Sequence, residues 1–285
     1  MKIAIIGAGN MGGAIVRGLV KSGGYNPEEI TCTARSEKTL ERLRECSQAL
    51  RTTTDNVEAA RGADIIVLAV KPWLIEEVME EIRPAVELKR QIIVSVAAGV
   101  SLSDMEHYLI PDYDFYQDQR ICAEVTGTEP NLPEWYADPA LFRVVPNTAA
   151  EVLESFTFVA SLNATEEQVG MVCRIFDSIG HTMVVPERLI AAGTSLASCG
   201  IAFAMRYIRA AMEGGVELGF RPEEAARIVE HTVRGAASLL LSSGAHPEAE
   251  IDKVTTAGGI TIKGLNAMER EGFTNAVIEG LKASR

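Results

Sequence analysis

The sequence lacks the paired cysteines and histidines that build disulfide frameworks and metal sites. Five cysteines, none of them in a Cys-x-x-Cys pair, are scattered along 285 residues, and the four histidines show no His-x3-His spacing. An odd number of dispersed cysteines is typical of reduced, mostly buried thiols, so we expect no disulfide framework and no metal site. A Gly-x-Ser-x-Gly elbow and a Walker lysine are also missing, which argues against a hydrolase or a kinase.

Basic residues and long apolar runs are also scarce. The chain has 27 Lys and Arg against 39 Asp and Glu, a net charge of -12. Nucleic acids and anionic membranes bind to concentrated positive charge, so we expect neither as a partner. The apolar segment Met1–Ile6 reaches Gly7 too soon for a secretory signal, and no later stretch runs about eighteen apolar residues without interruption. These absences predict a soluble, cytoplasmic protein.

The first half of the chain alternates short β-branched runs with helical patterns. Strands are predicted near residues 2–6, 30–34, 64–70 and 91–96. Helix starts are marked by Ser36, by Asp55, and by Ser101 with Asp104 three residues later. This alternation is typical of a parallel sheet wrapped by helices, and it predicts an α/β domain over residues 1–186.

The composition changes after Pro186. Ala, Gly, Glu and Leu dominate, and helical periodicity extends over residues 189–217, 222–241 and 260–282. The predicted second domain, residues 187–285, is therefore all-helical. Many small residues in these helices permit close packing against a second subunit, so we expect at least a homodimer.

The stretch of about residues 110–139 interrupts the alternation and looks like an inserted loop. It has no clear period and holds several aromatic residues: Tyr113, Phe115, Tyr116, Trp135 and Tyr136. One interpretation is a plain surface excursion, and the other is a lid or an oligomer contact made by these aromatics.

A glycine-rich turn follows the first strand. In the run Gly7-Ala8-Gly9-Asn10-Met11-Gly12, Gly7 makes the tight turn, Gly9 admits a pyrophosphate, and Gly12 lets helix and strand pack closely. The alternative is a turn with a purely structural role. The position of the glycine run between a strand and a helix favours instead a Rossmann-type dinucleotide-binding domain.

The end of the second predicted strand indicates which dinucleotide is bound. An Asp or Glu there selects NAD, whereas this chain has Arg35 and Ser36, with Lys38 close behind. A cation and a hydroxyl suit the 2′-phosphate of NADP, against the alternative of a solvated arginine. Glu37 is the residue that argues the other way.

Two further strand ends are candidate cofactor contacts. Lys71, in Ala69-Val70-Lys71-Pro72, is placed to touch a cofactor phosphate or ribose, or else it is solvated where Pro72 starts a helix. The small side chains of Ser95–Gly99, Ala97 among them, let a nicotinamide ring approach the backbone.

A run of hydroxyls and glycines precedes the last helical pattern. Thr255, Thr256, Gly258, Gly259 and Thr261 would present hydroxyls and amides to a carboxylate at a helix N-terminus. The threonines alternatively serve as plain helix caps.

Taken together, these motifs resemble the pyrroline-5-carboxylate reductase family over nearly the whole chain. The matching segments are Ile6 to Gly12 with Ala14-Ile15 and Gly18-Leu19, Asp55-Asn56, Ala69 to Pro72, Ala97 to Val100, Arg143-x-x-Pro146-Asn147-Thr148, and Val254 to Glu269. The last of these is the specific one, because it resembles the family's diagnostic loop and helix, which other Rossmann enzymes lack.

The resemblance implies an oxidoreductase of proline biosynthesis that reduces 1-pyrroline-5-carboxylate, a small imine, to L-proline with NADPH or NADH. It also implies a homodimer or a ring of dimers built by the helical domain. The implied cofactor-binding residues are Gly7, Ala8, Gly9, Asn10, Met11, Gly12, Arg35, Ser36, Asn56, Ala69, Val70, Lys71, Pro72 and Ala97. The implied substrate-binding residues are Thr256, Gly258, Gly259 and Thr261, with Thr261 as the hydrogen-bond donor to the ring nitrogen.

The chain departs from the family pattern at four places. Ala197-Ser198-Cys199-Gly200-Ile201-Ala202-Phe203 replaces Ser-Gly-Ser-Gly-Pro-Ala-Tyr, Ala257 replaces a proline, and Gly244 stands where a glutamate is frequent. The insertion between Leu109 and Phe142 is the fourth departure. A related imine or keto acid reductase and a non-catalytic NADP-binding paralogue are therefore the alternatives. A β-hydroxyacid dehydrogenase would need a lysine within residues 189–204, and none is present.

Overall fold

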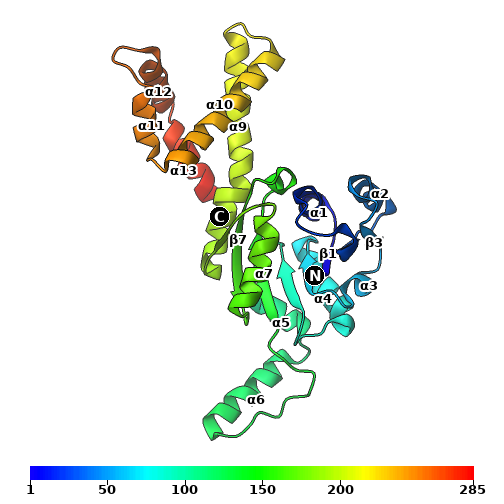
Figure 1. Ribbon diagram of the computed structural model, residues 1–285. Coiled ribbons are helices and arrows are strands. Elements are labelled where there is room, and N and C mark those ends of the chain that lie inside the picture. The colour runs from blue at the N-terminus through cyan, green and yellow to red at the C-terminus, as the bar shows by residue number, and fades with distance from the viewer. The chain divides into compact units, whose positions relative to one another are not determined.

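The β-branched runs of the first 198 residues form one eight-stranded sheet in the computed structural model, which describes residues 1–285 (Figure 1). The chain divides into two units, Met1–Ser198 and Cys199–Arg285. The strands are β1 (Ile3–Ile6), β2 (Ile30–Thr33), β3 (Arg51–Thr53), β4 (Ile65–Leu68), β5 (Ile92–Ser95), β6 (Ala140–Val145), β7 (Ser155–Leu162) and β8 (Gly180–Val184). Their order is β3-β2-β1-β4-β5-β6-β7-β8, and every neighbouring pair is parallel except β6 with β7.

Helices cover both faces of this sheet. They are α1 (Asn10–Ser22), α2 (Glu37–Cys46), α3 (Asn56–Ala60), α4 (Ile75–Ile82), α5 (Leu102–Leu109), α7 (Glu166–Asp177) and α8 (Ile190–Gly193). A further helix, α6 (Tyr113–Thr126), does not cover the sheet (Figure 1). Ile3 and Ile5 of β1 belong to a core cluster with α1 and α7, while Ala4 and Ile6 belong to a second cluster with α3, α4 and α5. Burial of alternate residues on opposite faces accounts for the continuous apolar runs, and the predicted Rossmann-type domain is confirmed.

The predicted helix starts are where the sequence indicated them. The Asp55 carboxylate accepts a hydrogen bond from the Glu58 amide at 2.9 Å, and Ser101 and Asp104 form a reciprocal capping box. Ser36 precedes α2, but its hydroxyl lies 3.0 Å from that of Thr39 and does not cap the helix.

The unit Cys199–Arg285 contains helices only, as predicted. They are α9 (Gly200–Glu217), α10 (Pro222–Ser243), α11 (Pro247–Lys253), α12 (Ile260–Arg270) and α13 (Phe273–Ala283). The long helix predicted over residues 260–282 is interrupted at Gly272, whose positive φ of 81° ends one helix and starts the next. A π-helical turn, Thr194–Cys199, likewise interrupts the helix predicted over residues 189–217.

One helical segment, Glu187–Glu217, is long and apolar enough to cross a membrane by length and composition alone, and 17% of its most apolar window is buried. A helix covered by a second copy of the chain exposes the same kind of surface when one copy is viewed alone. A single segment of this kind is weak evidence for a membrane span.

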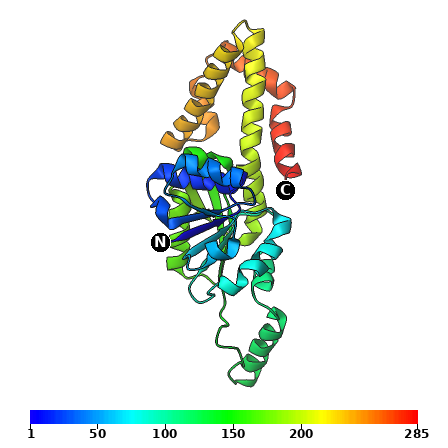
Figure 2. The same cartoon turned by 90° about the vertical axis from the view of Figure 1, so that its right-hand side faces the viewer.

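The segment expected as an inserted loop, residues 110–139, contains the 14-residue helix α6, so the expectation of a stretch without regular structure was wrong. Ala123 is the one buried residue of α6, and a helix that buries so little leaves no apolar period in its sequence. Figures 1 and 2 both show α6 standing apart from the sheet. Tyr116 packs against Trp135 and Tyr136, with ring centroids 5.8 Å and 5.2 Å away, so these aromatics hold the segment together.

Candidate active site

The turn between β1 and α1 has a geometry that only glycine permits at its first position. Gly7 has a φ of 93°, and a Cβ there would lie 2.6 Å from Cγ1 of Val70. The Gly7 amide donates to the carbonyl of Thr33 at 3.2 Å and to its hydroxyl at 3.1 Å, and the Ala8 amide donates to the same carbonyl at 2.7 Å. These bonds fix the turn against the neighbouring strand.

The other two glycines of the turn have different surroundings. A Cβ on Gly12 would lie 2.4 Å from the Gly7 carbonyl oxygen, so this position needs glycine for close packing of helix and strand. A Cβ on Gly9 would meet nothing within 4 Å, and the first turn of α1 has neither a side-chain cap nor an acidic residue. The open side of Gly9, next to free helix amides, is a suitable place for a pyrophosphate.

The structure brings the predicted cofactor residues to one edge of the sheet. The register pairs Ile6 with Thr33 and with Leu68, and Leu68 with Ser95. Because these strands are parallel, the segments that follow them emerge together: the glycine turn, Arg35-Ser36, Ala69–Pro72 and Ala97. Open α/β sheets bind ligands at this edge.

Thr33 and Asn56 connect the end of β2 to the start of α3. The Thr33 hydroxyl donates to Oδ1 of Asn56 at 2.7 Å, and Asn56 donates from Nδ2 to Glu81 at 2.8 Å. Thr33 is buried and lies beneath the turn, so it supports the cofactor edge without facing it. Sequence reasoning did not select Thr33, although a hydroxyl at the last residue of a strand was a usable signal.

The residues that set the dinucleotide preference lie on the surface just beyond β2. Arg35 and Ser36 are exposed. The Glu37 carboxylate, which argued against a phosphate, is paired with the Arg44 guanidinium. This ion pair turns the one nearby acid toward a cation of its own helix and leaves Arg35 available to an anion.

Neither Lys71 nor the cysteines supply an alternative chemistry at this edge. Lys71 is exposed and precedes the turn Pro72–Leu74, and it makes no ion pair. Burial raises the pKa of Cys32 to about 12, so this residue of β2 remains an unreactive thiol. No group of three or more His, Cys, Asp or Glu side chains is placed to hold a metal ion.

Arg143 stands in the family motif but was not selected as a site residue, and it lies beside the strand that leads to Ala97. It pairs with Ser95 in the β5–β6 register, and its Nη1 donates to Glu187 at 3.1 Å. Glu187 also accepts from the Leu102 amide at 2.9 Å, so the ion pair ties the turn after β5 to the residues that follow β8. Only spatial proximity reveals this role, because the three residues are far apart in the sequence.

The Pro146-Asn147 turn holds the π-helical turn in place. The Asn147 amide donates to the Ser155 hydroxyl at 3.1 Å, and its side chain reaches the Ala197 carbonyl at 3.5 Å. The Ser198 hydroxyl donates to the Pro146 carbonyl at 3.0 Å. The segment that departs from the family pattern is thus anchored at its first two residues.

In the second unit, the predicted substrate loop precedes α12. The Thr255 hydroxyl donates to the Ile251 carbonyl at 2.7 Å, in the last turn of α11, and so does not cap α12. The Thr256 and Thr261 side chains are exposed and make no hydrogen bond within the chain. Gly259 caps α12 without a side chain, and its first turn contains no acid, so amides and two hydroxyls are free to bind an anion.

The fold and the glycine turn define a dinucleotide-dependent oxidoreductase. Residues 2–99 match the family model described as NADP oxidoreductase coenzyme F420-dependent, and residues 187–285 match the model described as pyrroline-5-carboxylate reductase dimerisation. Pyrroline-5-carboxylate reductase 2 of Dictyostelium discoideum is 34% identical over 295 residues, covering 99% of this chain and 90% of that protein. The chain belongs to the pyrroline-5-carboxylate reductase family, the NAD(P)H-dependent oxidoreductases that act on a C=N bond.

Solved structures are similar over the same length. The structure of a pyrroline-5-carboxylate reductase from Coxiella burnetii is 28% identical with a TM-score of 0.82, covering 99% of this chain and 95% of that one. The pyrroline carboxylate reductase of Plasmodium falciparum, solved with NADP bound, is 24% identical with a TM-score of 0.82, covering 100% and 95%. The similarity to the Plasmodium falciparum structure shows the fold. The predicted order of domains, a Rossmann-type domain followed by a helical dimerisation domain, is confirmed.

Proposed function

We propose that this chain reduces 1-pyrroline-5-carboxylate to L-proline and prefers NADPH to NADH. The open, amide-lined side of Gly9, at the edge where four parallel strands end, supports the dinucleotide, and the family to which the chain belongs supports the substrate. The structure of the Plasmodium falciparum relative with NADP bound is consistent with that choice of cofactor. A cytoplasmic homodimer, or a ring of dimers, is part of the same proposal. The dimerisation family model over residues 187–285 supports oligomerisation.

The residues at this edge fit a phosphorylated dinucleotide. The glycine turn, Gly7 to Gly12, would hold the pyrophosphate through backbone amides, and Arg35 with Ser36 would hold the 2′-phosphate. Asn56, Lys71 and the backbone of Ala69 to Pro72 would line the ribose and phosphate path. Ala97, which is buried, would let the nicotinamide approach the end of β5.

The bound cofactor supplies a hydride to the imine carbon, and the ring nitrogen gains a proton. The chain's own residues orient the ring and polarise the C=N bond. Thr256, Gly258 and Gly259 would bind the carboxylate at the N-terminus of α12 through a hydroxyl and amides. The Thr261 hydroxyl would donate a hydrogen bond to the ring nitrogen, which is the catalytic role that we assign to it.

Replacing Arg35 with serine is expected to raise the KM for NADPH roughly tenfold, because a guanidinium paired with a phosphate is lost. The KM for NADH should stay within about twofold, since NADH lacks that phosphate. Steady-state kinetics with both cofactors measure the ratio. Arg61→Ser, which removes an exposed arginine elsewhere, is the control. An equal loss with both cofactors would exclude Arg35 from the phosphate site.

Replacing Thr256 with valine is expected to raise the KM for the substrate roughly tenfold, because one hydroxyl to a charged carboxylate is removed. NADPH affinity, measured by direct titration, should be unchanged. Thr128→Val removes an exposed hydroxyl in the α6 segment and serves as the control. An unchanged substrate KM would remove Thr256 from the site.

The assay that tests the function follows oxidation of NADPH with purified protein and 1-pyrroline-5-carboxylate, with proline quantified as the product. Turnover to proline is expected. NADPH binding without turnover would instead favour a different imine or keto acid substrate, or a non-catalytic paralogue. Binding without turnover would implicate Ala197–Phe203, where the chain departs from the family pattern. This segment overlaps the π-helical turn Thr194–Cys199.

A further inference from the structure

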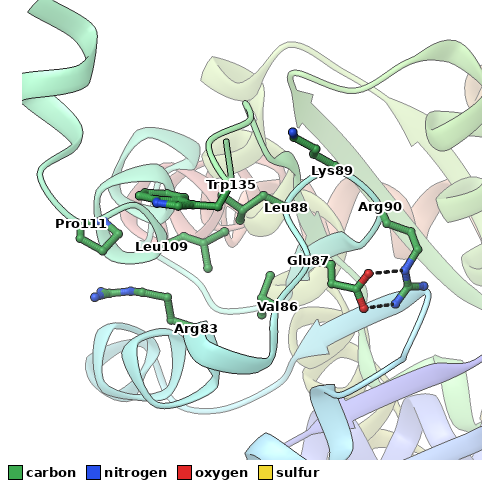
Figure 3. A pocket seen from close by; sticks show the side chains of 9 residues that line it. All are labelled: Arg83, Val86, Glu87, Leu88, Lys89, Arg90, Leu109, Pro111 and Trp135. Carbon is green, nitrogen blue, oxygen red and sulfur yellow. Dashed lines mark hydrogen bonds and ion pairs between the residues drawn. The ribbon is translucent and has the colours of Figure 1, made fainter. Parts of the chain in front are cut away.

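The unit Met1–Ser198 contains a cavity that the proposed reaction does not use (Figure 3). Its volume is about 520 Å³, within the range of small-molecule sites. Nine residues line it: Arg83, Val86, Glu87, Leu88, Lys89, Arg90, Leu109, Pro111 and Trp135.

This cavity lies at the edge of the sheet opposite the cofactor. The lining segment Val86–Arg90 directly precedes β5, whereas Ala97 follows β5 at its other end. Leu109 ends α5, and Pro111 and Trp135 belong to the segment that carries α6. The cavity therefore exists only because that segment returns to the sheet, and a ligand bound there would not compete with a dinucleotide.

The cavity carries more positive than negative charge in a chain of net charge -12. Arg90 is neutralised, because it pairs with Glu87 at 3.1 Å and with Asp64 at 3.0 Å. Lys89 has no carboxylate partner, since its Nζ donates to the backbone carbonyl of Glu134 at 2.7 Å. The remaining cation at the cavity wall is Arg83.

Arg83 has unused hydrogen-bonding capacity. Its Nη2 donates to the Tyr108 carbonyl at 2.6 Å, and the Glu80 carboxylate, which is largely exposed, lies 3.6 Å away. Its Nε is buried and has no hydrogen-bond partner. A buried donor without a partner is uncommon in native structures and indicates a missing acceptor.

The rest of the wall is apolar. In Figure 3, Trp135 lies over Leu88 and Leu109, and Arg83 runs below Leu109 and Pro111. The indole of Trp135 is held by Tyr116, with an edge-to-face contact of 5.8 Å between ring centroids. An aromatic platform with fixed neighbours offers a flat ligand group a defined contact surface.

We propose that this cavity binds a small organic anion, a carboxylate on an aromatic or branched apolar body. The carboxylate pairs with Arg83, and the body packs against Trp135, Leu88 and Leu109. A neutral molecule of the same shape leaves the Arg83 guanidinium without this anion and binds more weakly.

The chain contains two tryptophans, Trp73 and Trp135, so Trp73→Phe leaves Trp135 as a single fluorescent reporter. Phenylacetate is titrated into this variant with and without saturating NADPH, and phenylacetamide is the neutral counterpart. We expect a saturable change in emission that NADPH does not displace, with phenylacetamide binding roughly tenfold more weakly. In the same background, Arg83→Met should weaken phenylacetate binding at least about fivefold, and Lys89→Met, which removes a cation from the opposite end of the cavity, should not.

The comparison of phenylacetate with phenylacetamide keeps the test valid even if Arg83→Met unfolds, because it needs no substitution of Arg83. Four outcomes would overturn the proposal: no saturable signal, equal binding of acid and amide, binding unaffected by the loss of Arg83 in a folded variant, or displacement by NADPH. A shift of the emission maximum with protein concentration, measured without phenylacetate, would also overturn the proposal, because a second copy of the chain would then cover Trp135.

Discussion

Replacing Gly9 with alanine is expected to weaken NADPH binding roughly 100-fold, or about 2.7 kcal/mol, while the protein stays folded. The Cβ meets no protein atom within 4 Å, so the native chain accommodates it. It does occupy the space beside the first turn of α1 where a pyrophosphate must approach the backbone. Isothermal titration calorimetry with NADPH gives the affinity, and urea denaturation gives the free energy of unfolding.

Gly24→Ala is the matched control for Gly9→Ala. A Cβ on Gly24 meets its nearest heavy atom, the Ser22 hydroxyl oxygen, at 3.7 Å, an ordinary contact away from the cofactor edge. This variant should bind NADPH like the parent. If Gly9→Ala binds NADPH with parental affinity, the open side of the turn is not the pyrophosphate site.

Replacing Gly180 with alanine is expected to lower the free energy of unfolding by about 3 kcal/mol or more. The added Cβ would lie 1.9 Å from the Ser155 carbonyl oxygen and 2.5 Å from its nitrogen. Both atoms are backbone of the paired strand β7, so the strands must separate where Gly180 pairs with Ser155. Urea denaturation measures the loss.

Gly170→Ala provides a control of opposite sign. Gly170 lies inside α7, and a Cβ there would meet only the flexible end of Arg174, at 3.4 Å. Alanine in a helix interior is about 0.5–1 kcal/mol more favourable than glycine, so stability should rise slightly. A Gly180→Ala protein as stable as the parent would mean that β8 can shift away from β7 without cost.

The sequence allowed accurate prediction of the parallel strands that carry the cofactor edge. Their β-branched runs are buried on both faces, which gives a strong apolar signal, and the turn at Gly7 identifies the first of them. Strands β3, β6, β7 and β8 were not predicted. β3 has three residues, none of them buried, and leaves no apolar signal. β7 reverses direction relative to β6, and β8 has exposed residues such as Met183 and Val184, so neither follows the βαβ pattern on which the prediction relied.

For the site, the sequence indicated residues that contact a ligand through a local motif and missed those that act across the fold. Arg35 and Ser36 were found because a strand end has a known role. Arg143 and Glu187 act through a pairing between distant parts of the sequence, which no local pattern reports. The ion pair between Glu37 and Arg44 is likewise a spatial contact that no sequence motif indicates.

The segment bearing α6 has an evolutionary consequence. The segment begins after α5 and ends at Ala140, where β6 begins. The β5–β6 register is unbroken from the pair Ile92 and Ala140 to the pair Ser95 and Arg143. Lineages are therefore free to lengthen, shorten or replace these residues without shifting a strand. Such changes would remodel the cavity wall at Pro111 and Trp135 and leave the cofactor edge, at the other end of β5, in place.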